Sequence, residues 1–244
     1  MNSKAVFLAE VRRRWIYRKR YPVATITNLI TFAIFSFVAW VGLRSAFFKN
    51  EGIYGASATL LWPLVMTGFG AAYSALEEDI EVGTIEQLYL SAPSVLHLLH
   101  IRALADLMDS LVVIVAPFFL AAGFYLGWDT LGRWTITKAI PLWLSLYGLG
   151  LILAGLILRY RRLGTLSNLI NMGTLALAVV QGPDHGIWLW LQNLFPMVNA
   201  SATPNWPVGW WLRYPAAVGY LLLGIWVFRR LETQAKRLGL IGKY

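Results

Sequence analysis

The segment VATITNLITFAIFSFVAWVGL, residues Val23–Leu43, holds 21 consecutive residues without a charged side chain. A helix rises about 1.5 Å per residue, so this segment is long enough to cross the roughly 30 Å hydrocarbon core of a bilayer. The run ends at Arg44 without the small-x-small pattern of a cleavage site, and it is too long for a signal peptide. We therefore expect it to be a membrane-spanning helix.

Five further predominantly apolar runs follow along the chain. Together they predict an all-α integral membrane protein in which one transmembrane domain, residues 1–244, contains six spans. Asn168 and Asn171 interrupt the fifth run, which is the weakest by composition. The predicted spans are 23–43, 54–76, 104–128, 139–158, 163–181 and 214–228.

The composition agrees with a membrane protein. Hydrophobic residues make up 58% of the chain and charged residues 14%, whereas an ordinary soluble domain is about 25% charged. Twelve tryptophans, eleven tyrosines and twelve phenylalanines suit aromatic belts at two membrane interfaces. The chain has no cysteine, which excludes disulfides, thiolate metal sites and cysteine nucleophiles.

The basic residues are distributed unequally between the two sides of the predicted membrane. If both termini are cytoplasmic, sixteen lysines and arginines lie inside and five outside, which is the pattern of the positive-inside rule. The five outside residues are Arg44, Lys49, Arg133, Lys138 and Arg213. Because topology accounts for the net charge of +9, we do not expect nucleic acid as a partner.

The N-terminal segment, residues 1–21, precedes the first predicted span. Phe7, Leu8, Val11 and Trp15 recur at helical spacing, and most of the basic residues lie off that stripe. This pattern predicts an amphipathic helix that lies in the cytoplasmic interface and contacts membrane lipids. A disordered basic tail is the alternative.

The cytoplasmic loop 77–102 is acidic at its start, against the charge pattern of the other inside segments. Within it, Thr84-Ile85-Glu86-Gln87 matches a capping box, in which the Thr84 hydroxyl would accept the backbone N–H of Gln87. The chain turns at Gly83, and Pro93 ends the element, so we expect a short helix over residues 85–91.

This short helix carries Leu88, Tyr89 and Leu90. A helix of one to two turns is not stable alone, so it needs a partner surface or the lipid interface to bury these side chains. Ser94 follows as the expected N-cap of the next helix. An ordinary interfacial turn is the alternative to a docking element.

The outer segment 182–213 contains four prolines that separate two apolar aromatic stretches, 187–195 and 206–212. These stretches are too short to span a bilayer and suit re-entrant or interfacial half-helices packed on protein at the outer leaflet. Two aromatic-belt segments with no role beyond anchoring are the alternative. The residues singled out in this segment, called the candidate gate residues below, are Trp188, Trp190, Phe195, Pro196, Trp206 and Trp210.

Catalytic patterns are sparse. The three histidines are isolated, we expect no metal site, and no lysine is followed by the serine or threonine that a P-loop requires. Asp106 and Asp109 lie near the start of the third span, where carboxylates suit the helix dipole, and Asp106 is placed to pair with Arg102 at i,i+4.

The stretch EEDIEVGTIEQLYLSAPSVLHLLHIRA, residues 77–103, resembles the hallmark of ABC transporter permease subunits of the type 2 exporter class. The matching features are an acidic residue, Gly-Thr-(apolar)-Glu-x-Leu, a proline after a small residue, and an apolar run into the third span. The outer loop 44–53 is short, so a large external domain is absent from this pattern.

The resemblance implies a type V exporter fold that exports a hydrophobic, lipid-like or glycan substrate. A second permease chain would complete a homodimer or related heterodimer, and two copies of a separate ABC ATPase subunit would bind ATP and Mg²⁺, with no cofactor on this chain. The location implied is the cytoplasmic (inner) membrane of a bacterium or archaeon. The residues implied to couple to the ATPase are Thr84, Ile85, Glu86, Gln87, Leu88, Tyr89, Leu90 and Pro93.

Two other functions stay open at the level of sequence. A membrane-embedded lipid-modifying enzyme would be favoured if Asp106, Asp109 and His100 converged on one cavity. A non-transporting assembly subunit would be favoured by a sealed interface between two chains.

Overall fold

The structure is a computed structural model that describes residues 3–23, 25–27, 29–31, 34, 52–91, 94–110, 128–160, 164–179, 186–198 and 210–239. All regular secondary structure in these ranges is helical, which confirms the all-α prediction for the described residues. The elements are α1 (Ser3–Arg20), α3 (Gly52–Glu81), α4 (Ile85–Ser91), α5 (Val95–Ser110), α7 (Trp128–Trp134), the π-helix η2 (Thr135–Ala139), α8 (Ile140–Tyr160), α9 (Gly164–Val179), α10 (Ile187–Leu194), the 3₁₀ turn η3 (Trp210–Leu212) and α11 (Arg213–Arg237).

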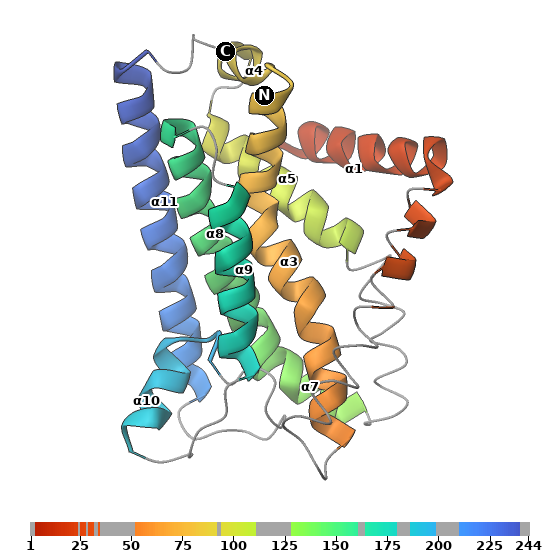
Figure 1. Cartoon of the computed structure of the whole chain (residues 1–244), viewed down its shortest axis with the longest axis vertical. Helices are drawn as coiled ribbons and strands as arrows, with labels where there is room; N and C mark the ends of the chain where they lie inside the picture. Colours follow the sequence, from red (N-terminus) through yellow and green to blue (C-terminus); the bar gives the residue numbers. More distant parts are fainter. Residues whose placement is uncertain are drawn as a thin grey trace.

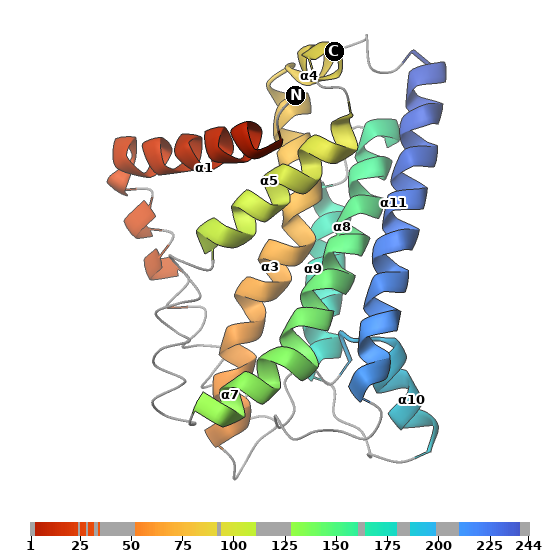
Figure 2. The same ribbon diagram turned by 180° about the vertical axis from the view of Figure 1, so that it is seen from behind.

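Four long helices, α3, α8, α9 and α11, run roughly along one axis and form a bundle (Figures 1 and 2). Helix α5 crosses the bundle obliquely, and α1 lies across one end and projects sideways. The start of α1, helix α4 and the last turn of α11 are at this same end, whereas α7 and α10 are at the opposite end.

Helix α8 is the centre of the bundle and packs against both α3 and α11. Its glycines let the backbones touch: a Cβ on Gly148 would meet the backbone of Tyr220, and a Cβ on Gly150 would meet the Phe69 carbonyl. Gly224 of α11 in turn lies on the Gly148 carbonyl. Small residues at helix contacts are the usual means of close packing in membranes.

Two apolar clusters fill the bundle. One contains Phe69, Leu142 and Leu146, together with Met197 and Val198 that follow α10. The other joins α3, α5, α8 and α11 to α4, and its fully buried members include Leu76, Ile85, Leu99, Leu151 and Phe228. Helix α4 is therefore part of the packed core and not an appendage to it.

By length and composition, two helical segments in the described part of the chain are apolar enough to cross a membrane. They are Thr135–Tyr160, with 26 residues, and Trp210–Arg237, with 28 residues. The first is mostly buried by its neighbours, whereas the second is mostly exposed and presents Val218, Leu222 and Trp226 at intervals of four residues. Two segments are fewer than the six spans that the sequence predicts.

Two further predicted spans coincide with helices of the structure. Residues 54–76 fall within α3, and residues 163–181 correspond to α9, which has 16 residues. Most of the predicted spans 23–43 and 104–128 lies outside the described residues. The presence of six membrane spans therefore stays a prediction. Helices at four of the six predicted places are confirmed.

Candidate functional site

The connection from α3 to α4 is a tight turn at the end of the bundle that also holds the start of α1. Gly83 has a φ of 77°, which L side chains rarely adopt, and its N–H donates to the Ile80 carbonyl at 3.1 Å. The Thr84 N–H then donates to the Asp79 carbonyl at 2.8 Å. The short helix α4 begins directly afterwards, with the bounds predicted from the sequence.

The predicted capping box is wrong in its hydrogen bonds. The Thr84 hydroxyl does not cap the N–H of Gln87; it bonds the Asp79 carbonyl and the Asp79 carboxylate, each at 3.3 Å. The end of α3 lies one tight turn away, so Asp79 competes successfully for this hydroxyl. The contact fixes the first residue before α4 to the last turns of α3.

One face of α4 packs on the bundle. Ile85 is fully buried in the second apolar cluster, and Leu88 and Tyr89 pack against that cluster. The Lys236 ammonium of α11 lies 5.0 Å from the centre of the Tyr89 ring. The burial that this helix requires is therefore supplied in part by its own chain.

The other face of α4 is open. Leu90 is 83% exposed, Glu86 and Gln87 are exposed, and Val82 in the preceding turn is 69% exposed. An exposed leucine and valine beside a carboxylate and an amide form a small mixed surface at the end of the bundle. Pro93, the last residue implied by the resemblance, lies outside the described residues.

Helix α5 begins where the sequence predicts. The His97 N–H donates to the Ser94 hydroxyl at 3.3 Å, so Ser94 is the N-cap. This cap sets the register in which α5 presents Arg102, Asp106 and Asp109 toward α1.

Helices α1 and α5 are joined by three ion pairs, here called the ion-pair ladder. Arg102 lies 3.3 Å from Glu10, Arg14 pairs with Asp106, and Arg18 lies 2.5 Å from Asp109. Glu10, Arg14 and Arg18 are spaced by four residues, so they share one face of α1. The ladder links segments that are about ninety residues apart in the sequence.

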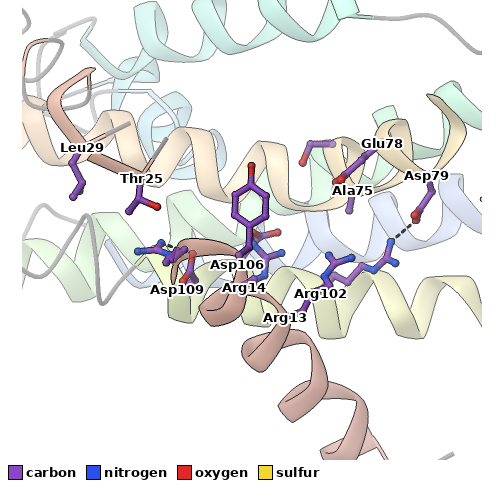
Figure 3. Close-up of a pocket in the computed structure, with 13 residues that line it drawn as sticks. Arg13, Arg14, Thr25, Leu29, Ala75, Glu78, Asp79, Arg102, Asp106 and Asp109 are labelled. Atoms are coloured by element: carbon purple, nitrogen blue, oxygen red, sulfur yellow. Dashed lines mark hydrogen bonds and ion pairs between the residues drawn. The ribbon is translucent and has the colours of Figure 1, made fainter. Parts of the chain in front are cut away.

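Asp79 of α3 extends the ladder into the bundle. Its carboxylate accepts a hydrogen bond from the guanidinium of Arg102, a residue that is 8% exposed (Figure 3). Burial lowers the pKa of Arg102, but the hydrogen bond and charge of Asp79 and the charge of Glu10 outweigh it and raise that pKa. The predicted pairing of Arg102 with Asp106 is wrong, because each finds a partner on another helix.

Helix α1 confirms the predicted N-terminal helix, and three of the four residues of its predicted apolar stripe, Leu8, Val11 and Trp15, are exposed. The side that meets the protein is formed by Phe7 and the charged ladder residues. The exposed side carries Leu8, Trp15 and Ile16 among basic residues, with the Lys19 ammonium 5.4 Å from the Trp15 ring centre. Apolar side chains interleaved with lysine and arginine are typical of a helix at a lipid interface.

A cavity of about 510 Å³ lies between α1, α3 and α5 (Figure 3). Asp106 and Asp109 line it, whereas His100 does not and instead bonds the Tyr147 hydroxyl of α8 at 2.5 Å. Burial, followed by the charges of His97 and Arg229, lowers the pKa of His100. The three residues that an enzyme hypothesis needs together are therefore separated.

The described candidate gate residues lie at the opposite end of the bundle, on and after α10. Trp188 and Trp190 belong to this eight-residue helix, and the ring of Phe195 lies 6.3 Å from that of Tyr220. Pro196 is buried, Trp210 begins η3, and Trp206 lies outside the described residues. The first predicted half-helix is thus confirmed as a helix.

Arg213 fixes α10 to the start of α11. This arginine is 1% exposed, and its Nε donates to the Asn193 side chain at 3.1 Å. Neither residue was singled out by sequence reasoning as a contact of the outer segment. The position of a basic residue directly before a predicted span was the available signal.

The ion-pair ladder was also missed from the sequence. Its signal was the complementary spacing of Glu10, Arg14 and Arg18 with Arg102, Asp106 and Asp109, which only becomes meaningful once the two helices are known to meet. No protein-family model, curated protein or solved structure matches the chain. Among the described residues, no group of three or more histidines and carboxylates is placed to hold a metal ion.

Proposed function

We propose that the chain is the transmembrane permease subunit of an ATP-driven exporter of the ABC type 2 class. Two such chains form the path for a hydrophobic, lipid-like or glycan substrate, and each binds a separate ATPase subunit through α4. The six predicted spans and the type V exporter fold belong to this proposal, with α1 in the cytoplasmic interface.

The observation that carries the proposal is the position of α4. It lies at the end of the bundle that also holds the start of α1 and the end of α11, where the charge distribution predicts the cytoplasm (Figure 1). It is anchored by Ile85 and leaves Leu90, Glu86 and Gln87 exposed. A partner groove that accepts Leu90 would bury the side chain that the bundle leaves open.

The contacts of α4 provide a route for coupling. The Thr84 hydroxyl bonds Asp79, Asp79 bonds Arg102, and Arg102 pairs with Glu10 of α1. A displacement of α4 by ATP binding on the partner would therefore act on α3, α5 and α1 together. Rigid contacts of this kind are the physical means by which one site biases another.

The energy source follows from the distribution of charge. Within the predicted spans, the carboxylates Asp106 and Asp109 lie near the start of the third span, in the last turns of α5, and each has an arginine partner. An ion-driven cycle needs ionisable groups along its path, and the apolar centres of the spans offer none in the sequence. Hydrolysis of ATP on a separate subunit supplies the alternative. In this proposal α10, at the opposite end of the bundle, acts at the exit.

Co-purification tests the proposal. The tagged chain, expressed from its native host, is expected to carry an ABC ATPase, and Leu90→Asp is expected to release it. In the complex, Leu90 would be buried in the ATPase groove, and its loss removes about 1.5–3 kcal/mol of burial free energy from binding. The new carboxylate would also have to be desolvated there.

Leu238→Asp is the matched control, since Leu238 is also exposed at the end of α11. Equal recovery of the ATPase with wild type and Leu90→Asp would contradict the role of α4. Absence of any ATPase from the wild-type preparation would contradict the proposed class.

A further inference from the structure

The cavity between α1, α3 and α5 has the size of a ligand site, about 510 Å³ against the roughly 300–1,000 Å³ typical of such sites. Its described lining contains four arginines and four carboxylates, so its formal charge is balanced. A balanced lining favours a ligand that itself carries both charges over a polyanion. The charged lining residues are Arg13, Arg14, Arg18, Arg102, Glu78, Asp79, Asp106 and Asp109.

Most of these charges are already paired, but three lining groups keep free capacity. Arg13 contacts Glu10 through its Nε, which leaves its terminal nitrogens available, and its side chain is 57% exposed. Glu78 is exposed and makes no ion pair with the described residues, and the Tyr17 hydroxyl makes no hydrogen bond with them. Guanidinium and phenol groups donate to phosphate, whereas a carboxylate accepts from ammonium.

An apolar rail leads away from the cavity along the chain that follows α1. Val23, Ile26, Ile30 and Ile34 recur every three or four residues and are all more than half exposed. Thr25 and Leu29, from the same stretch, line the cavity (Figure 3). A polar cavity continued by an apolar rail complements an amphiphile, with its headgroup in the cavity and its acyl chain along the rail.

We propose that this cavity binds a glycerophospholipid whose headgroup carries a phosphate and a primary ammonium. Arg13 and Tyr17 hold the phosphate, Glu78 holds the ammonium, and the ion-pair ladder keeps the walls of the cavity in place. The inference rests on the membrane placement in the proposed function and is independent of the ATPase partner.

The test measures lipid affinity of the purified full-length chain in detergent by native mass spectrometry. Phosphatidylethanolamine is expected to bind more tightly than phosphatidylcholine, because a trimethylated ammonium cannot donate a hydrogen bond to Glu78. It is also expected to exceed phosphatidylglycerol, which has no cation. Soluble phosphoethanolamine is the arm that separates a lipid from a free headgroup, and it is expected to bind weakly.

Two variants assign the contacts. Glu78→Gln is expected to weaken phosphatidylethanolamine binding on the order of tenfold, as fits one lost charge-assisted hydrogen bond, and to weaken phosphatidylcholine binding less, because that lipid loses only an attraction between charges. Arg13→Gln is expected to weaken both lipids. Glu86→Gln on α4 and Arg12→Gln on α1 are the matched controls, because both residues are exposed and neither lines this cavity.

Equal affinity for phosphatidylethanolamine and phosphatidylcholine, or an unchanged Glu78→Gln variant, overturns the proposal. Binding of soluble phosphoethanolamine as tightly as the lipid overturns the lipid as ligand. A chain that fails to float with liposomes overturns the membrane placement itself, so that failure of the proposed function is recognised separately. A missing ATPase has no effect on any of these measurements.

Discussion

The contact between α8 and α11 and the contact between α1 and α5 hold helices together in opposite ways. In the first, Gly148 and Gly224 bring two backbones into direct contact without any charge. In the second, three ion pairs between long side chains join the helices. One contact depends on the absence of side chains and the other on their charge.

The difference corresponds to the two environments that the proposed topology assigns. In the middle of a bilayer, apolar side chains gain little from leaving lipid, so close backbone packing is the main source of helix association. At the interface, water and charged headgroups lower the desolvation cost of ion pairs. There, α1 turns its charged face toward the protein and its apolar residues away from it.

Arg102→Met is expected to have the largest effect. It leaves Asp79 without its cation and Glu10 with Arg13 alone, and the removal of one partner of a buried pair costs about 3–5 kcal/mol. Thermal unfolding in detergent measures the loss. Arg133→Met is the control, because the exposed pair of Arg133 with Asp129 is worth about 0–1 kcal/mol. Similar losses in both variants would show that the ladder is no stronger than a surface pair.

Gly224→Val is expected to destabilise the chain by about 1–3 kcal/mol, because its Cβ would lie on the Gly148 carbonyl and force α8 and α11 apart. Gly219→Val, on the same helix with open space around it, is expected to be tolerated. The two variants are compared by thermal unfolding in the same detergent. Equal stability of the two variants would show that the contact of Gly224 with Gly148 does not hold α8 and α11 together.

Thr84→Ala is expected to cost about 1 kcal/mol, the typical contribution of one hydrogen bond, since it removes the contact of α4 with Asp79. Hydrogen exchange of the α4 amides reports the local loss. The variant is also expected to weaken ATPase binding less than Leu90→Asp does. Unchanged exchange in α4 would show that Thr84 does not fix this helix to α3.

The smallest expected effect concerns pH. Burial lowers the pKa of His100 in the folded chain below its ordinary value of 6.5. As the pH falls below about 6.5, the unfolded chain binds the proton first, so stability present at neutral pH is lost. The unfolding temperature of wild type is expected to drop more between pH 7.5 and pH 5.5 than that of His100→Gln. Parallel curves would contradict this assignment.

The local parts of the fold could be predicted from the sequence. The bounds of α4, the Ser94 cap of α5 and the helix over Ser3–Arg20 follow from residues within a few positions of one another. Spacing and turn residues determine such elements. The same local reasoning failed at Thr84, because the Thr84 hydroxyl bonds Asp79 of the preceding helix and not the backbone of α4.

The contacts between distant segments could not be predicted in the same way. The partner of Arg14 is Asp106, and nothing in the spacing of either helix states that α1 crosses α5. The helical spacing of the apolar residues on α1 predicted the helix correctly, but a stripe does not specify whether lipid or protein covers it. For α1, the ladder residues settle the side that meets protein.

The topology underlies both sides of the comparison and is testable because the chain has no cysteine. Single cysteines at Lys49 and Ala202 are expected to react with an impermeant maleimide on intact cells, whereas one at Ser94 is not. Reaction at Ser94 on intact cells would place α4 outside and end the proposed docking.

The most direct test of the central claim follows the exposed residue of α4. A single cysteine in the Leu90→Cys variant is labelled with maleimide in inside-out vesicles, with and without the co-purified ATPase subunit, and Leu238→Cys is labelled in parallel. The account predicts that the ATPase slows labelling at position 90 strongly and leaves position 238 unchanged. Equal labelling rates at position 90 with and without the ATPase would contradict it.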